Sequence, residues 1–165
     1  MKAIDILNKY NACQEAVEWV GDKSLEEAWN TCHRGDWMLW IYAKLYPENI
    51  RELTLAKGHC ANTIRHLMKD QRSIDAVDAA IAFGEGKITA TELTKYTAAA
   101  YAAAYAATYA ATYAATAATA AHAAYAAAYA AARAATADAA ARKKNQQQTA
   151  DICRQYLKLS IELKD

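Results

Sequence analysis

Residues that interrupt helices are scarce in this chain of 165 residues, which has one proline and five glycines. From Thr89 onward it has neither. Proline and glycine oppose helix formation most strongly, so their absence removes the usual helix stops from the second half of the chain. No segment alternates apolar and polar residues for long enough to indicate a β-strand. These absences predict an all-α fold, a compact helical bundle.

The chain also has few cysteines, little net charge and no long strongly apolar run. Its four cysteines are widely scattered, and its first residues lack the pattern of a secretory signal, so we expect reduced thiols and a cytoplasmic protein. Threonine and charged residues interrupt the longest alanine-rich stretch, which argues against a membrane span. The net charge of +1 argues against a non-specific nucleic-acid binder.

A segment rich in alanine, tyrosine and threonine, residues 97–141, dominates what the chain does contain. Four tyrosines recur in it every four residues: Tyr101, Tyr105, Tyr109 and Tyr113. This spacing places side chains on one face of a helix, and alanine has the highest helix propensity. We therefore expect a long helix here, or a helical hairpin.

The length of this segment favours the hairpin. An unbroken helix over 89–144 would exceed ~75 Å at about 1.5 Å per residue, which is too long for a compact domain of this size. We expect the chain to fold back around 116–122, where the spacing of the large residues changes. The tail 149–163 is predicted to form a final amphipathic helix that returns to the core.

Start and stop signals divide the first ninety residues into shorter helices. Capping boxes are predicted at Asn11 with Gln14, Ser24 with Glu27, and Thr89 with Glu92. Helix ends are predicted at Gly21, Gly35 and Pro47, and further helices over 48–68, with Leu67 facing inward, and 73–83. Asp36 is expected to cap the helix 37–46, and the basic cluster 142–144 to lie at a helix C-terminus or on a solvated face.

The chain is thus expected to form a single all-helical domain, 1–165. Its predicted parts are tryptophan-rich N-terminal helices (1–88), an alanine-, tyrosine- and threonine-rich helical region (89–144) and a C-terminal helix (149–165).

The tyrosine-bearing face has more than one interpretation. Alanines let helices approach closely, and tyrosines can fill the remaining gaps, so the face can be a packing surface within one chain or between copies. The tyrosines, with His122, Arg133 and Arg142, can also form a pocket for a planar or phosphorylated ligand, because aromatic rings stack on bases and guanidinium groups bind phosphate.

A second dense patch, residues 28–40, holds three of the four tryptophans, and Trp19 lies upstream. Indole rings are too large to remain exposed without a reason, so we expect most of them in the core where the N-terminal helices meet. Arg34 is expected to pair with a carboxylate, Asp36 included.

This patch also carries a resemblance to a known family. The residues concerned are Cys13, Ala16, Glu18, Trp19, Ala28, Trp29, Cys32 and the run Arg34-Gly35-Asp36-Trp37-Met38-Leu39-Trp40, followed by a glycine-rich turn and a tyrosine–alanine repeat. The pattern resembles that of alanine-rich bacterial and phage proteins described as immunity proteins, over nearly the whole length. The resemblance implies a helical protein that binds and neutralises a toxin or defence component, with no catalytic residues to transfer.

Signals for metal binding or catalysis are weak. Histidine and cysteine adjoin twice, at Cys32-His33 and His59-Cys60, but adjacent helical residues point in different directions, whereas zinc ligands occur in spaced pairs. No nucleophile elbow or oxyanion-hole signature accompanies these residues. We predict no enzyme, metal or cofactor.

The leading hypothesis is a non-enzymatic inhibitor of a bacterial toxin or defence protein, of the immunity or counter-defence type. The alternatives are a protein that sequesters a nucleotide-type small molecule and a structural homo-oligomer. The residues assigned to ligand or partner binding are Arg34, Asp36, Tyr101, Tyr105, Tyr109, Tyr113, Arg133 and Arg142.

Overall fold

A computed structural model describes residues 2–108 and 139–159 of the chain, with the side chains of 101–108 and 139 excepted. In these two segments every regular element is helical, apart from an isolated bridge between Lys2 and Ser24, which confirms the all-α fold class. The elements are α1 (Ala3–Lys9), α2 (Gln14–Val20), α3 (Leu25–Thr31), α4 (Gly35–Leu45), α5 (Ile50–Asn62), the 3-10 helix η1 (Arg65–Leu67), α6 (Gln71–Gly84), α7 (Ala90–Thr108) and α9 (Ala139–Tyr156).

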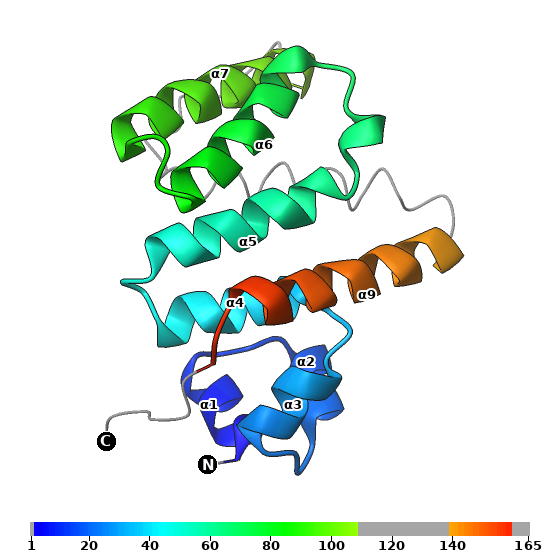
Figure 1. Cartoon of the computed structure of the whole chain (residues 1–165). Coiled ribbons are helices and arrows are strands. Elements are labelled where there is room, and N and C mark those ends of the chain that lie inside the picture. The colour runs from blue at the N-terminus through cyan, green and yellow to red at the C-terminus, as the bar shows by residue number, and fades with distance from the viewer. Residues whose placement is uncertain (1, 109–138, 160–165) are drawn as a thin grey trace.

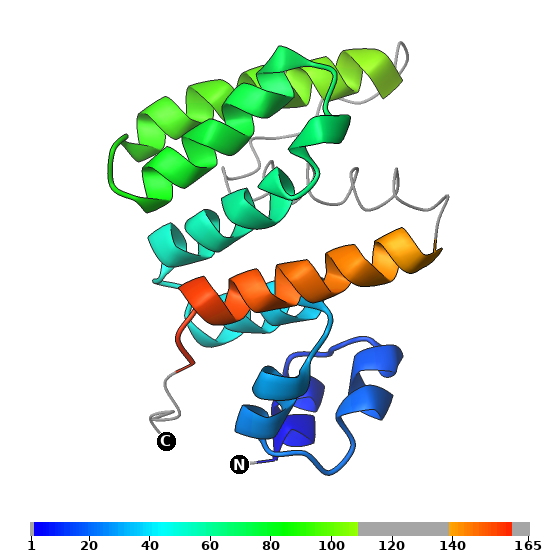
Figure 2. The same ribbon diagram turned by 45° about the vertical axis from the view of Figure 1, so that its right-hand side comes forward.

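The helices are arranged in successive layers (Figure 1). The short helices α1, α2 and α3 form one end of the molecule, and α6 with α7 forms the other end in both views (Figures 1 and 2). Between them lie α4, α5 and α9, with α9 packed against both α4 and α5. The C-terminal helix is therefore placed in the middle of the stack, next to helices far away in the sequence.

The main hydrophobic core surrounds α4 and draws on helices from both described segments. Its buried members include Ile6, Trp29, Met38, Leu53 and Cys153. A smaller cluster joins α6 to α7 through Ala79, Ala80, Phe83 and Leu93. No helix in the described segments is both long enough and apolar enough to cross a membrane.

Two glycines allow neighbouring helices to approach closely. A Cβ atom added at Gly35 would lie 2.6 Å from the backbone carbon of Thr149, where α4 meets α9. A Cβ atom added at Gly84 would lie 2.7 Å from the Cα atom of Leu55, where α6 meets α5. Both distances are shorter than real side-chain contacts, so the helix spacing at these two points requires glycine.

Two of the three predicted capping boxes are present. The Ser24 hydroxyl accepts from the Glu27 N–H at 3.1 Å, and the Glu27 carboxylate accepts from the Ser24 N–H at 2.9 Å. Thr89 and Glu92 make the same reciprocal pair at 3.2 Å and 2.8 Å. The predicted helix end at Gly21 is also confirmed, since Gly21 follows α2 with a φ of 51°.

The third predicted capping box, at Asn11, is wrong. Cys13 precedes α2, while Asn11 has a φ of 55° and belongs to the end of α1. The Asn11 N–H donates to the Asn8 carbonyl at 3.1 Å, and the Ala12 N–H donates to the Leu7 carbonyl at 2.9 Å. These bonds satisfy the last carbonyls of α1, and asparagine tolerates the left-handed conformation that they require.

Other predicted boundaries are also corrected. Gly35 begins α4 rather than ending α3, which stops at Thr31, and Asp36 lies in the first turn of α4 instead of capping it. The helix expected over 48–68 ends at Asn62, after which η1 follows and leaves Leu67 exposed.

The C-terminal helix lies earlier in the sequence than the predicted range 149–163. Residue 149 lies inside α9, which spans Ala139–Tyr156 and ends before Leu159. The basic cluster 142–144 is exposed, as expected for a solvated face, but it does not lie at a helix C-terminus because α9 continues beyond it. The fold-back expected at 116–122 lies outside the described residues.

Candidate functional site: a tryptophan-lined pocket

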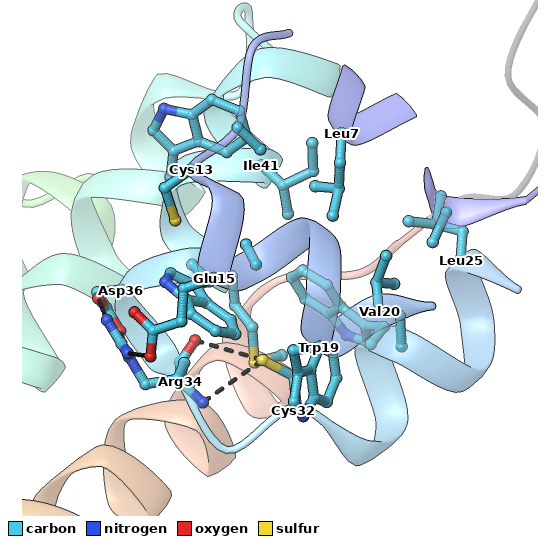
Figure 3. A pocket seen from close by; sticks show the side chains of 18 of the residues that line it. Leu7, Cys13, Glu15, Trp19, Val20, Leu25, Cys32, Arg34, Asp36 and Ile41 are labelled. Carbon is cyan, nitrogen blue, oxygen red and sulfur yellow. Dashed lines mark hydrogen bonds and ion pairs between the residues drawn. The ribbon is translucent and has the colours of Figure 1, made fainter. Parts of the chain in front are cut away.

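A pocket of about 340 Å³ lies between the N-terminal helices and the start of α4. All four tryptophans of the chain line it, together with small and aliphatic side chains from α1, α2 and α3 (Figure 3). Cavities of this size are in the range that accommodates small ligands or the anchoring side chains of a partner. We call this cavity the tryptophan pocket.

The pocket has an apolar side and a polar side. Figure 3 shows Leu7, Val20 and Leu25 on one side, and on the other the polar side chains Cys13, Glu15, Arg34 and Asp36. The polar residues come from two loops and the helix turns that follow them, between α1 and α2 and between α3 and α4. These two loops form the mouth of the pocket.

The walls of the pocket are held by local caps and by α9. The capping box of Ser24 and Glu27 starts α3, and the left-handed Asn11 turns the chain from α1 into α2. Arg154 of α9 donates from Nε to the Trp29 carbonyl at 3.2 Å and from Nη2 to the Cys32 carbonyl. A guanidinium group at the last carbonyls of a helix satisfies their hydrogen bonds and opposes the negative end of its dipole.

Three of the indole rings keep part of their surface accessible. Trp29 is buried and packs near Tyr42, with 6.3 Å between ring centroids. Trp19, Trp37 and Trp40 are half-buried, and the Trp19 and Trp37 rings lie 5.9 Å apart at 57°. Only one of the tryptophans is therefore a fully buried core residue, and the others present aromatic surface along the pocket.

Arg34 organises the polar mouth. Its Nε and Nη2 atoms donate to the two carboxylate oxygens of Asp36 at 2.9 Å and 2.6 Å, and its Nη1 donates to Glu15 at 3.1 Å. Its guanidinium carbon also lies 4.4 Å from the centre of the Trp37 ring. The hydrogen bond with Asp36 is the main cause that raises the pKa of Arg34. The expected pairing of Arg34 with Asp36 is confirmed, and Glu15 is a second partner.

Cys32 fixes the loop between α3 and α4. Its Sγ accepts from the Arg34 N–H at 3.4 Å and donates to the Arg34 carbonyl at 3.5 Å. Burial raises the pKa of the Cys32 thiol, so the sulfur stays protonated at neutral pH. A protonated buried thiol is a weak nucleophile, and its role here is to shape the mouth.

The shape and lining of the pocket are suited to binding. Within residues 2–108 and 139–159, no group of three or more histidine, cysteine, aspartate or glutamate side chains is placed to hold a metal ion. The polar groups of the mouth are engaged with one another, and the remaining lining is apolar. The geometry fits an apolar or aromatic group that enters between the indoles.

The residues assigned to binding from the sequence do not form one site. Arg34 and Asp36 lie at the mouth of the tryptophan pocket, whereas Tyr101 and Tyr105 belong to α7 at the opposite end of the molecule (Figure 1). Arg142 is exposed on α9. The other three assigned residues, Tyr109, Tyr113 and Arg133, lie outside the described residues.

Sequence reasoning missed that the tryptophans line a cavity, and it missed Cys13 and Glu15 at the mouth. The signal that could have found the aromatic lining is the concentration of every tryptophan within residues 19–40. Four large rings in three short helices are hard to pack without leaving space, because short helices bury little area around each ring.

Comparison with known proteins gives no independent support for a family. The chain matches no protein-family model, no curated protein and no solved structure.

Proposed function

We propose that the chain is a non-enzymatic binding protein of the immunity type, which neutralises a bacterial toxin or defence component by docking onto it. The tryptophan pocket receives an apolar side chain of that partner. One observation carries the proposal: a cavity of about 340 Å³ lined by all four tryptophans and open at a polar mouth.

The chemistry of the pocket supports a protein partner. Tryptophan, tyrosine and arginine supply most of the binding energy in protein interfaces, where large side chains enter pockets surrounded by polar groups. The tryptophan pocket offers indole surface inside and Glu15, Arg34 and Asp36 around its opening. Because this opening is held by hydrogen bonds before any partner arrives, little ordering is needed on binding.

The family resemblance supports the same region. Its most specific part is the run from Arg34 to Trp40, and within that run Arg34, Asp36, Trp37, Met38 and Trp40 all line the pocket. A run that served only to build α4 would need apolar residues on its inner face, without a paired arginine and aspartate at the mouth.

The two alternative functions, nucleotide sequestration and structural oligomerisation, rest mainly on side chains between residues 101 and 138, with Arg142 added for the nucleotide pocket. Of the residues named for that pocket, only the Arg142 side chain lies in the described part of the chain, where it is exposed, so both functions stay predictions.

The first step of the test is to identify the partner. Cys13 is the exposed cysteine among four and lies at the pocket mouth, so it can carry a photo-crosslinking maleimide selectively. The labelled chain is irradiated in a lysate of bacteria that carry the gene, and mass spectrometry identifies the adduct. The partner is then produced with and without the chain, and growth is measured.

The second step assigns neutralisation to the pocket. Ala12→Phe fills a half-buried position in the pocket lining, and Ala98→Phe makes the same change on the exposed surface of α7 at the other end. We expect the wild type and Ala98→Phe to protect growth, and Ala12→Phe to lose at least about tenfold in affinity for the partner. Full protection by Ala12→Phe would contradict the proposal, and loss through Ala98→Phe would point to the alanine–tyrosine surface instead.

A further inference from the structure

We infer that the tryptophan pocket selects a positively charged partner segment, in which a lysine or arginine lies beside the apolar anchor. This inference rests on the proposed function and specifies the chemistry of the partner. It follows from the charges at the mouth, the distribution of charge along the chain, and the indole faces.

The mouth carries more negative than positive charge. Arg34 contributes one positive charge, and its two partners Asp36 and Glu15 contribute two negative charges. The Glu15 side chain is 69% exposed and that of Asp36 is 53% exposed, whereas the Arg34 side chain is only 15% exposed. A group that approaches the pocket therefore meets the carboxylates before it meets the guanidinium.

An anionic group would meet an arginine that is already paired with two carboxylates. The Nε, Nη1 and Nη2 atoms of Arg34 each donate to Asp36 or Glu15, which engages three of its five N–H groups. An incoming carboxylate or phosphate could use only the two remaining N–H groups and would face the repulsion of both carboxylates. A cation instead can share the exposed carboxylates without breaking the arrangement.

Negative charge is also concentrated in the N-terminal part of the chain, which forms the pocket. Residues 2–36, which contain α1, α2 and α3, hold four lysine or arginine residues and seven aspartate or glutamate residues, a net charge of −3, although the whole chain is +1. The end of the molecule that contains the pocket is thus acidic. An acidic surface accelerates the approach of a basic partner at low ionic strength.

The indole rings of the pocket already bind cations of the chain itself. Besides Arg34 over Trp37, the Lys23 ammonium lies 4.8 Å from the Trp19 ring and the Lys44 ammonium 5.9 Å from the Trp40 ring. The negative face of an indole ring attracts cations, most strongly where water is partly excluded. The same rings can attract a lysine or arginine of a partner that enters between them.

Matched peptides test this inference on the intact chain. The probes are Ac-Lys-Phe-Leu-Lys-NH2 and Ac-Glu-Phe-Leu-Glu-NH2, which share their apolar residues and differ in charge. Every tryptophan lines the pocket, so intrinsic tryptophan fluorescence responds when the pocket is occupied. We expect the basic peptide to bind at least about fivefold more tightly at low salt, with a smaller difference at high salt.

Two substitutions that each remove one negative charge test whether the charge preference arises at the mouth of the pocket. Glu15→Gln removes a carboxylate at the mouth, whereas Glu18→Gln removes one from the exposed surface of the same helix, outside the pocket lining. We expect Glu15→Gln to abolish most of the preference for the basic peptide and Glu18→Gln to preserve it.

Three results would overturn the inference: equal or tighter binding of the acidic peptide, no saturable binding of either peptide, or equal losses in the two variants. None of them depends on the growth assay with Ala12→Phe. A partner neutralised through the pocket but carrying an acidic anchor would therefore refute the charge selection alone.

Discussion

At the scale of single residues, Asn11 determines how the chain enters the pocket region. It is the non-glycine residue with a positive φ among the described residues, and it links α1 to α2 at the pocket mouth. The left-handed conformation costs a residue with a Cβ atom free energy, which asparagine tolerates better than most side chains. The direction of this turn therefore depends on one side chain.

Substitutions at Asn11 should separate the backbone requirement from the side chain. Asn11→Gly should leave the free energy of unfolding unchanged or raise it slightly, whereas Asn11→Val should lower it by about 1–2 kcal/mol, because a β-branched residue resists positive φ. Urea denaturation followed by circular dichroism measures both. Equal stability of the two variants would show that the turn does not require the left-handed conformation.

At the scale of elements, the packing of helix pairs depends on small contacts at their crossings. Gly84 lets α6 approach the backbone of α5 at Leu55, and Gly35 lets α4 approach α9 at Thr149. Across the junction of α5 and α9, the His59 and Tyr156 rings stack at 4.4 Å with an angle of 6°. Each contact joins helices that share no backbone hydrogen bonds. The contribution of each contact to the free energy of unfolding should therefore be measurable by substitution.

Gly84→Ala should lower the free energy of unfolding by about 1–3 kcal/mol, because the added methyl group meets the backbone of Leu55 and the helices must move apart. Glu85→Ala, at the next and exposed position, serves as the control and should change stability by less than about 0.5 kcal/mol. Thermal unfolding of both variants measures the difference. A Gly84→Ala variant as stable as the wild type would mean that α5 and α6 are spaced more widely than the contact of Gly84 with Leu55 indicates.

Protonation of His59 should weaken the junction of α5 and α9. Burial lowers the pKa of His59 below its ordinary value of 6.5, although nearby Glu85 partly opposes this shift. The unfolded chain then takes up a proton at a higher pH than the folded chain, so stability falls as the pH drops below about 6.5. His59→Phe keeps a ring against Tyr156 and should reduce the dependence of the free energy of unfolding on pH. Urea titrations between pH 7.5 and pH 5, in steps of about half a pH unit, measure this dependence. An unchanged slope would assign the pH dependence to other groups.

At the scale of the whole molecule, α9 joins the two halves of the stack. Ala150, Cys153 and Leu157 are almost fully buried in the main core, and Arg154 binds the end of α3 behind the pocket. The Cys60 thiol of α5 donates to the Thr149 carbonyl at 3.7 Å and the Cys153 thiol to the Gly35 carbonyl at 3.6 Å. The neighbouring Cys60 thiol, together with burial, raises the pKa of Cys153. The thiols of this region should therefore respond to opening of the whole fold.

Thiol reactivity should report that opening. In the native protein we expect an aromatic disulfide reagent to modify one cysteine quickly, Cys13, and to leave Cys32, Cys60 and Cys153 unmodified until the core opens. Absorbance during titration with and without urea measures the number of reactive thiols. Cys13→Ser should remove the fast reaction, and rapid modification of three or four thiols in the native state would contradict the position of α9.

Local features of this protein could be predicted from the sequence because they depend on residues no more than four positions apart. The all-α class, the two capping boxes beginning at Ser24 and Thr89, the end of α2 at Gly21 and the pairing of Arg34 with Asp36 are of this kind. Asn11 was misassigned because asparagine suits both the start of a helix and the left-handed turn after one, and only the surrounding chain distinguishes them.

The candidate site depended on the tertiary structure. Glu15 meets Arg34 only because α2 folds against the start of α4, and Arg154 meets Trp29 only because α9 returns to the middle of the stack. Such contacts arise from the shapes of packed helices, which helix propensity and spacing do not encode. The sequence by itself determined the all-α class and the helix ends that local caps specify, which are the starts of α3 and α7 and the end of α2. Packing determined that four tryptophans surround a cavity with an acidic mouth.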